Sequence, residues 1–127
     1  MSMKFLDTFQ TWEDMVEFSA QTVIFAERDP ADVMYVIISG EVELTLHGQR
    51  LGTEGKGGII GEMAMINSAT RNATATALTD VKLARLDHKQ FKGFISKDSK
   101  FSLHVMAVLA NRLRAVDRYI TKQITGD

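Results

Sequence analysis

The stretch GIIGEMAMINSATRNAT, residues 58–74, predicts how the middle of the chain folds. Two isoleucines favour a short strand, and Gly61 then allows a sharp change of direction into what reads as a single helical turn. A short polar loop follows, after which the chain returns through Arg71 into a second β-prone run. The pattern therefore predicts a strand, a turn and a strand, with Arg71 at the base of the loop.

The same stretch predicts an anion site. A turn opened by glycine presents backbone N–H groups and a positive dipole end to an anion. Arg71 carries a guanidinium that can donate two hydrogen bonds to a phosphate. Glu62 would be unfavourable beside a phosphate unless it accepted hydrogen bonds from sugar hydroxyls. These parts together indicate a pocket for a phosphate attached to a ribose.

The residues around this stretch favour short strands separated by tight turns. Seven of the nine glycines lie between positions 40 and 61, which indicates frequent turns. Runs rich in β-branched and aliphatic side chains occupy residues 22–25, 33–39, 42–46 and 81–86. Short strands at close spacing are typical of a sandwich or barrel, so residues 21–87 are predicted to form a β-roll.

Both ends of the chain read as helical. Residues 1–20 place apolar side chains at helical spacing, namely Phe9, Trp12, Met15 and Val16. Residues 88–96 read as a short helix and residues 99–124 as one long helix, with Ser99 as its N-cap. We therefore expect an N-terminal helical segment over 1–20 and C-terminal helices over 88–127.

The long helix carries apolar residues at steps of three and four, namely Met106, Leu109, Leu113, Val116 and Ile120. This is heptad spacing over about two heptads. Two interpretations are open: the helix packs against its own β-roll, or it pairs with the same helix of a second copy in a homodimer.

Composition limits the class of protein. The chain has 127 residues, of which 45% are hydrophobic and 24% charged, which fits one globular domain over residues 1–127 and excludes a disordered chain. The formal net charge of −1 shows no basic excess of the kind that dedicated nucleic-acid binders carry. The absence of cysteine excludes disulfides, thiolate metal sites and cysteine nucleophiles.

The sequence shows neither targeting signals nor catalytic motifs. It has no apolar run of about 18 residues, the length needed to span a membrane, and no signal peptide, so a cytoplasmic protein is expected. It has no phosphate-loop pattern and no nucleophile elbow, and its three histidines lack metal-ligand spacing. We therefore expect no enzyme activity, no metal and no cofactor.

Residues 60–74 resemble the phosphate-binding cassette of cyclic nucleotide-binding domains, which occur in catabolite activator proteins, cyclic-nucleotide-dependent kinases and gated channels. That cassette runs Gly-Glu-x-Ala, a hydrophobic pair, a short loop and Arg-x-Ala-Thr. The matching positions here are Gly61, Glu62, Ala64, Met65, Ile66, Arg71, Ala73 and Thr74. Segments 22–25 and 29–42 also follow the family pattern, so the resemblance covers about residues 5–120.

The resemblance implies a mainly β fold, a jelly-roll-like double-stranded β-helix of eight strands with an N-terminal helix and a long C-terminal helix. It implies a regulatory module that holds cyclic AMP or cyclic GMP. By the same resemblance, Arg71 pairs with the cyclic phosphate and Glu62 holds the ribose 2′-hydroxyl. The turn of Gly61, Met63 and Ala64 directs N–H groups at ligand oxygens.

Other positions concern how the purine base of the nucleotide is contacted and which base is preferred. The resemblance brings Thr74 to the phosphate or the purine edge and makes the long helix a lid, with residues 116–120, including Tyr119, over the purine. In eukaryotic members a Thr directly after the Arg accompanies cyclic GMP, and an Ala accompanies cyclic AMP. This chain has Asn72 there, whose amide donates or accepts. We favour cyclic AMP as the ligand.

Several alternatives remain open. Arg28 and Ala31 replace glycines of the family pattern, where a positive φ is expected. Glu62 and Arg71 would form an internal ion pair if the domain bound no nucleotide and served only to contact protein. The chain would otherwise be a regulatory piece of a larger channel, kinase, transporter or transcription factor. Direct DNA binding is not expected, because too few residues follow the long helix for a helix-turn-helix, and no downstream protein partner is indicated.

Overall fold

The computed structural model describes residues 4–66 and 69–125. Residues 1–3 of the predicted helical segment, 67–68 of the cassette and 126–127 of the predicted C-terminal helices lie outside it. The strands are β1 (Met15–Phe18), β2 (Val23–Phe25), β3 (Val33–Ser39), β4 (Val42–Leu46), β5 (Gln49–Glu54), β6 (Ile59–Ile60), β7 (Thr74–Ala77) and β8 (Val81–Asp87). The helices are α1 (Lys4–Gln10), α2 (Met63–Ile66), α3 (His88–Lys97) and α4 (Ser99–Thr125).

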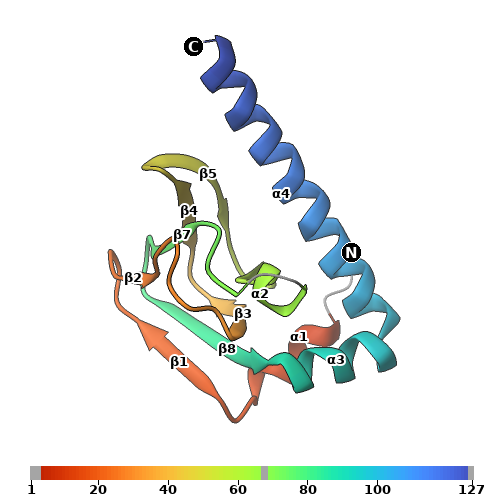
Figure 1. The fold of residues 1–127 in the computed structure, drawn as a ribbon. Coiled ribbons are helices and arrows are strands. Elements are labelled where there is room, and N and C mark those ends of the chain that lie inside the picture. Colours follow the sequence, from red (N-terminus) through yellow and green to blue (C-terminus); the bar gives the residue numbers. More distant parts are fainter. Residues whose placement is uncertain (1–3, 67–68, 126–127) are drawn as a thin grey trace.

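The eight strands of the described residues form two antiparallel sheets of four strands each (Figure 1). One sheet has the order β1-β8-β3-β6 and the other the order β2-β7-β4-β5. Helix α1 precedes the strands and the long helix α4 follows them. The expected mainly β fold with flanking helices is confirmed.

Strand β3 lies at the centre of the fold, because both of its faces are buried. Met34, Val36 and Ile38 belong to the apolar cluster between the first sheet and the helices. Tyr35 and Ile37 belong to the cluster between the two sheets. Successive side chains of a strand point to opposite faces, so a strand covered on both sides reads as a nearly continuous apolar run.

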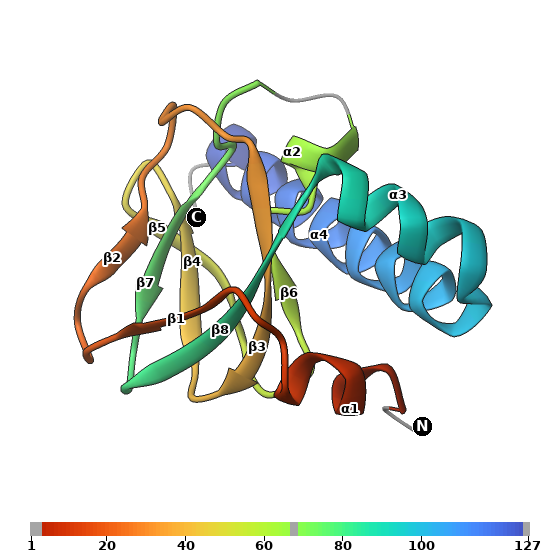
Figure 2. The ribbon, with the colours of Figure 1, turned by 90° about the horizontal axis from the view of Figure 1, so that it is seen from below.

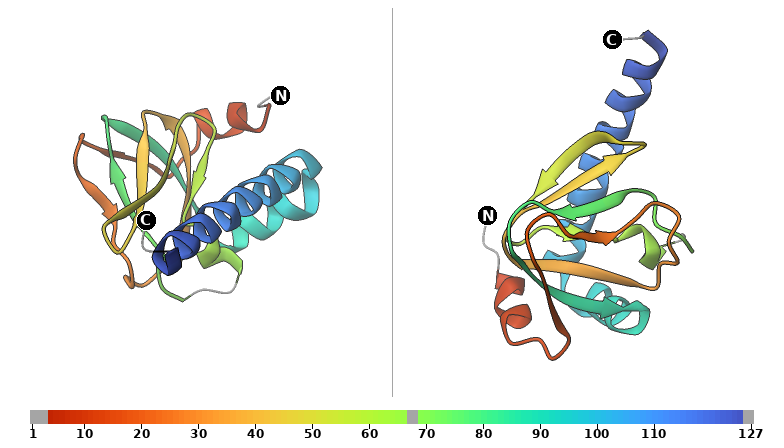
Figure 3. Two further views of the ribbon diagram at one scale, coloured as in Figure 1. Left: turned by 90° about the horizontal axis from the view of Figure 1, so that it is seen from above. Right: turned by 90° about the vertical axis from the view of Figure 1, so that its left-hand side faces the viewer.

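Helices α1, α3 and the first half of α4 lie beside the first sheet (Figure 2). Phe9 of α1 contacts the rings of Trp12, Phe94 and Phe101, at centroid distances of 5.0, 5.0 and 6.2 Å. The C-terminal half of α4 continues past β5 and extends beyond the roll (Figures 1 and 3). In the described part of the chain, none of the helices combines the length and the apolar character that a membrane span requires.

The predicted helix over 1–20 is wrong beyond Gln10, where α1 ends. Residues Met15–Phe18 instead form β1, which pairs antiparallel with β8. Trp12 lies between the two elements, and its indole N–H donates to the carbonyl of Arg85 at 2.8 Å. The apolar spacing that suggested one helix thus serves two elements, because pairing with the open edge of β8 outweighs local helix propensity.

The sequence pattern did not predict strand β5. Its sequence QRLGTE has one large apolar residue and no alternation, because β5 is an edge strand that pairs with β4 alone. An edge strand with solvent on one side leaves little hydrophobic pattern to detect.

Helix α4 has a different N-cap from the one predicted. The side chain of Asp98, rather than that of Ser99, accepts hydrogen bonds from the N–H groups of Lys100 and Phe101, at 3.0 and 3.1 Å. Ser99 is the first residue of the helix itself. A carboxylate one residue earlier is the better cap, because it also interacts favourably with the helix dipole.

Replacing the cap should destabilise the fold measurably. Asp98→Ala is expected to lower the free energy of unfolding by about 1 kcal/mol, because two N–H groups of α4 lose their acceptor. Ser99→Ala should change it by less than about 0.5 kcal/mol, since no cap is lost. Urea unfolding of the two variants measures both values, and equal losses would show that Asp98 is not the cap.

Candidate functional site

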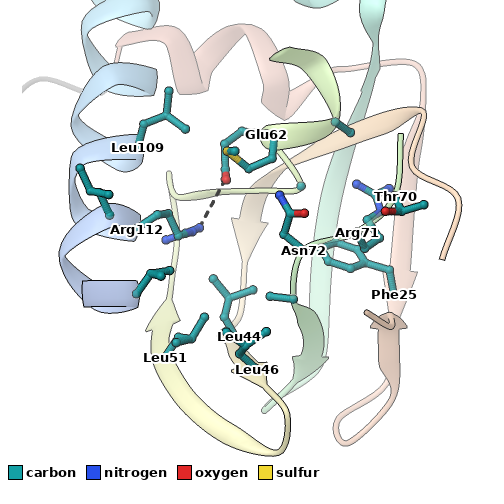
Figure 4. A pocket seen from close by; sticks show the side chains of 16 residues that line it. Phe25, Leu44, Leu46, Leu51, Glu62, Thr70, Arg71, Asn72, Leu109 and Arg112 are labelled. Carbon is teal, nitrogen blue, oxygen red and sulfur yellow. Dashed lines mark ion pairs between the residues drawn. The ribbon is translucent and has the colours of Figure 1, made fainter. Parts of the chain in front are cut away.

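A cavity of about 420 Å³ lies between the β-roll and α4 (Figure 4). Most of its walls are apolar, with Leu44, Leu46 and Leu51 on one side and Leu109, Leu113 and Val116 of α4 on another. The predicted residues Gly61, Glu62, Met63, Ala64, Arg71, Asn72 and Ala73 also line it. The structure therefore brings seven of the eight predicted site residues to one cavity.

Arg71 is held in place by its backbone and by the end of its side chain. Its N–H donates to the carbonyl of Asp29, and its carbonyl accepts from the N–H of Arg28, both at 2.9 Å. Nη1 donates to the carbonyl of Val33 at 2.8 Å, and the guanidinium lies 4.2 Å from the centroid of the Phe25 ring. The side chain is thus oriented before any ligand arrives.

Of the two positions where the family pattern has a glycine, Arg28 and Ala31, one has the expected positive φ. Arg28 has a φ of 72°, in the left-handed region where the family pattern has a glycine. Ala31 is not among the residues with positive φ, and it is buried. The substitution at Arg28 therefore carries the backbone strain, while Ala31 fits an ordinary conformation.

The guanidinium of Arg71 retains an unused donor. Arg71 is 7% exposed, and its Nε is buried without a hydrogen-bond partner among the described residues. Burial lowers the pKa of Arg71 from its ordinary value, because the charged form loses its hydration. An arginine remains charged under all physiological conditions, so a buried N–H without an acceptor is unfavourable.

Gly61 makes room for this side chain. Its φ is 76°, and a Cβ at this position would lie 2.6 Å from Nη1 of Arg71. That separation is shorter than any ordinary contact. A side chain at position 61 would therefore displace the guanidinium.

Glu62 is buried on the α4 side of the cavity, with an exposed fraction of 3%. Its Oε1 lies 3.5 Å from Nη2 of Arg112 and has no hydrogen-bond partner in the part of the chain that the structure describes. Figure 4 shows this ion pair at the opposite end of the cavity from Arg71 and Phe25. The alternative of a Glu62–Arg71 ion pair is thus not what the structure shows, because Glu62 pairs with Arg112.

Arg112 is a charged site residue that sequence reasoning missed. Its Nη1 donates to Glu54 at 2.6 Å, and its Nη2 donates to the carbonyl of Ile59 at 2.7 Å. The one available signal was its position three residues after Leu109 on the helix predicted to close the pocket, which places both on one helix face. Through Arg112, α4 is tied to the cassette.

Two predicted residues lie elsewhere. Thr74 does not line the cavity, and its hydroxyl accepts from the N–H of Glu27 at 3.0 Å. Tyr119 lies farther along α4, where its hydroxyl is 3.0 Å from Nδ1 of His47. The N–H of Ala64, predicted to point at ligand oxygens, donates instead to the carbonyl of Gly61 at 3.2 Å. In the described residues, no group of three or more His, Asp or Glu side chains could hold a metal ion.

The titration of Glu62 should be visible in the stability of the fold. Burial raises the pKa of Glu62 above its ordinary value of 4.5, and Arg112 partly offsets the rise. Between pH 4.5 and the raised pKa, the folded state holds a proton that the unfolded state has lost. The stabilising contribution of Glu62 is therefore complete below pH 4.5 and is lost as the pH rises through the folded-state pKa.

Urea unfolding of the wild type and Glu62→Gln at several pH values tests this. The wild-type free energy of unfolding minus that of the variant is expected to fall as the pH rises from about 4 to 8. A difference that is flat or that increases with pH would show that burial does not control the pKa of Glu62.

The profile of the cyclic nucleotide-binding domain matches residues 15–98, which span the described strands, the cassette and α3. The chain belongs to the cyclic nucleotide-binding domain family. Among curated proteins, it is similar to a CRP-like cAMP-activated global transcriptional regulator of Mycobacterium tuberculosis, with 29% identity over 120 residues. That match covers 88% of this chain and 52% of the regulator, so the chain spans about half the length of this relative.

Two solved structures show the likeness in three dimensions. The cAMP-bound form of the EAL enzyme Bd1971 is 34% identical with a TM-score of 0.63, covering 89% of this chain and 32% of that chain. The c-di-GMP-responsive global regulator CLP of Xanthomonas campestris has a TM-score of 0.83 at 21% identity, covering 99% of this chain and 66% of that chain. The likeness to CLP concerns the fold alone. This cyclic nucleotide-binding domain therefore shares its architecture with regulators and with a domain of an enzyme.

Proposed function

We propose that this domain is a sensor that binds cyclic AMP in the cavity between the β-roll and α4. The observation that carries the proposal is a pair of buried polar atoms, Nε of Arg71 and Oε1 of Glu62, which lack hydrogen-bond partners within residues 4–66 and 69–125. One is a donor on a cation and the other an acceptor on a carboxylate, and both side chains line one cavity. A ligand with an anionic group and a hydroxyl would satisfy both.

The cavity supports an arrangement of the nucleotide. The cyclic phosphate meets Arg71 beside the backbone of Gly61 and Met63, and the ribose 2′-hydroxyl donates to Glu62. The base then lies against the leucines at positions 44, 46 and 51 and against α4, because these walls are apolar. Apolar walls with a few oriented polar groups are typical of small-molecule sites.

The preference for cyclic AMP rests on this wall and on the relatives. Guanine has a carbonyl and an amino group at its edge that would lose water against leucine side chains, whereas adenine has one amino group. The mycobacterial relative is described as cAMP-activated, and the similar Bd1971 domain is known in both cAMP-bound and cGMP-bound forms. We therefore expect binding of both nucleotides, with cyclic AMP the tighter.

The link from ligand to α4 runs through Arg112. Arg112 bridges Glu62, Glu54 and the carbonyl of Ile59. A ribose hydroxyl that donates to Glu62 changes the hydrogen bonding of the carboxylate that Arg112 contacts. The position of α4, which carries Arg112, therefore depends on the ligand. A ligand shifts such an equilibrium by its differential affinity for the two positions, typically ~1–3 kcal/mol.

Isothermal titration calorimetry tests the proposed ligand. Cyclic AMP is expected to bind one site per chain, cyclic GMP to bind more weakly, and 5′-AMP, with the same base and sugar, to bind weakest of the three. Competition between the two cyclic nucleotides should show one shared site. Heat signals indistinguishable from buffer for both cyclic nucleotides would leave the protein-binding alternative as the better account.

A homodimer through α4 is the second part of the proposal. Several apolar side chains of α4 remain exposed, namely Leu103, Met106, Leu113, Ile120 and Ile124. A row of exposed large apolar residues favours a helix partner. Light scattering at two concentrations, with and without cyclic AMP, should give a mass of two chains, and Met106→Glu should reduce it to one.

We place this sensor in the cytoplasm, as a single domain without catalysis, whether alone or within a larger regulator.

A further inference from the structure

We infer that a second, anion-binding cleft lies between the start of β5 and the C-terminal half of α4. This cleft has a volume of about 370 Å³. Gln49 and Arg50 line it from the hairpin, and Arg118, Tyr119 and Lys122 line it from the helix. No Asp or Glu is among its lining residues in the described chain. The ligand class that fits is a small phosphorylated compound with two or more negative charges.

Helix α4 carries a row of like charges, two of which line the cleft. Arg114, Arg118 and Lys122 recur at intervals of four, which places them in one line along α4. Like charges at this spacing destabilise a helix. Within residues 4–66 and 69–125, neither Arg118 nor Lys122 forms an ion pair, and Arg50 has a loose one with Glu43 at 4.0 Å. An anion in the cleft would relieve this repulsion.

The cleft is preorganised by a contact beside it. The hydroxyl of Tyr119 lies 3.0 Å from Nδ1 of His47, and the backbone N–H of His47 donates to Glu27 at 3.0 Å. This contact ties α4 to the β4–β5 turn and fixes the cations of the two elements relative to each other. Less ordering is then needed when an anion binds.

The cleft shares a wall with the nucleotide cavity. Leu51 lines both, and the adjacent residues Ala115 and Val116 of α4 face one each. An anion that draws α4 toward β5 therefore favours the same closure that retains a nucleotide. This coupling rests on the proposed function, whereas binding of the anion itself does not.

NMR titration of the ¹⁵N-labelled chain with inorganic pyrophosphate at constant ionic strength tests the cleft. Saturable shifts are expected at the amides of residues 49–51 and 115–122. The double variant Arg118→Gln/Lys122→Gln should weaken binding at least fivefold, and Lys89→Gln/Lys92→Gln, which removes two exposed cations of α3, should leave it within twofold. Shifts spread equally over the lysines of α3, or equal effects of the two double variants, would overturn the inference.

The wild-type shift map decides the matter even if the double variant loses its fold. Repeating the titration with saturating cyclic AMP then measures the coupling, and tighter pyrophosphate binding by twofold or more is expected. If cyclic AMP fails to bind, the proposed function fails while the cleft stands. If pyrophosphate produces no saturable shifts, the cleft fails while the proposed function stands.

Discussion

Arg71→Ala is expected to weaken cyclic AMP binding by at least tenfold. The variant removes a cation that is oriented by Val33 and Phe25 and whose Nε has no acceptor among the described residues. A hydrogen bond to a charged group contributes about 1.5–3 kcal/mol, which corresponds to roughly 10- to 150-fold in Kd for one contact. Calorimetry with both proteins measures the change.

The loss of binding should not reflect unfolding. Arg71→Ala removes the cation–π contact with Phe25, worth about 0.5–2 kcal/mol, and the hydrogen bond to the carbonyl of Val33. It also removes a buried charge that has no ion-pair partner among the described residues, and this relief opposes the two losses, so the melting temperature should change little. Arg71→Lys serves as the matched control, because it keeps the charge and loses the planar donor set, and intermediate binding is expected. Unchanged affinity in Arg71→Ala would refute the assignment of Arg71 as the residue that binds the cyclic phosphate.

Gly61→Ala is expected to have the second largest effect on binding, because it moves the same guanidinium indirectly. The added Cβ would lie 2.6 Å from Nη1 of Arg71, so the side chain must leave its place beside the carbonyl of Val33. The φ of 76° adds strain of about 1–2 kcal/mol for a residue with a Cβ. A tenfold or greater rise in Kd for cyclic AMP is therefore expected, together with a loss of stability.

Gly48→Ala separates the two causes. Gly48 has a φ of 78°, nearly that of Gly61, but a Cβ there would have no atom within 4 Å. The stability loss should therefore be similar, while the affinity for cyclic AMP should stay within twofold of the wild type. If Gly48→Ala weakened binding as much as Gly61→Ala, strain rather than the position of Arg71 would be responsible.

The cassette was predictable because its chemistry is local in sequence. Gly61, Glu62 and Arg71 lie within eleven consecutive positions, and residue type alone indicates what each can bind. The runs that became β3 and β4 were predicted to the residue, because buried strands keep a strong apolar pattern. These elements required no knowledge of distant neighbours.

The remaining features depend on contacts that the sequence does not record. Met15 belongs to a strand because β8 offers it a partner 69 positions away, at Ala84. Arg112 enters the site because the path of α4 brings it to Glu62, fifty positions earlier. Thr74, by contrast, has the family residue type, but its hydroxyl accepts a hydrogen bond from the N–H of Glu27 in this structure. Tertiary placement decides such cases, and propensity does not.

The most direct test follows the Nε–H of Arg71 by NMR during a titration with cyclic AMP. This proton is buried and has no acceptor within residues 4–66 and 69–125, so a phosphate bound there should shift its resonance and slow its exchange with water. The Nε–H of Arg85, already bonded to Asp14 at 2.9 Å, should stay unchanged and serves as the internal reference. Saturation of the protein with cyclic AMP without any change at Arg71 would contradict the account.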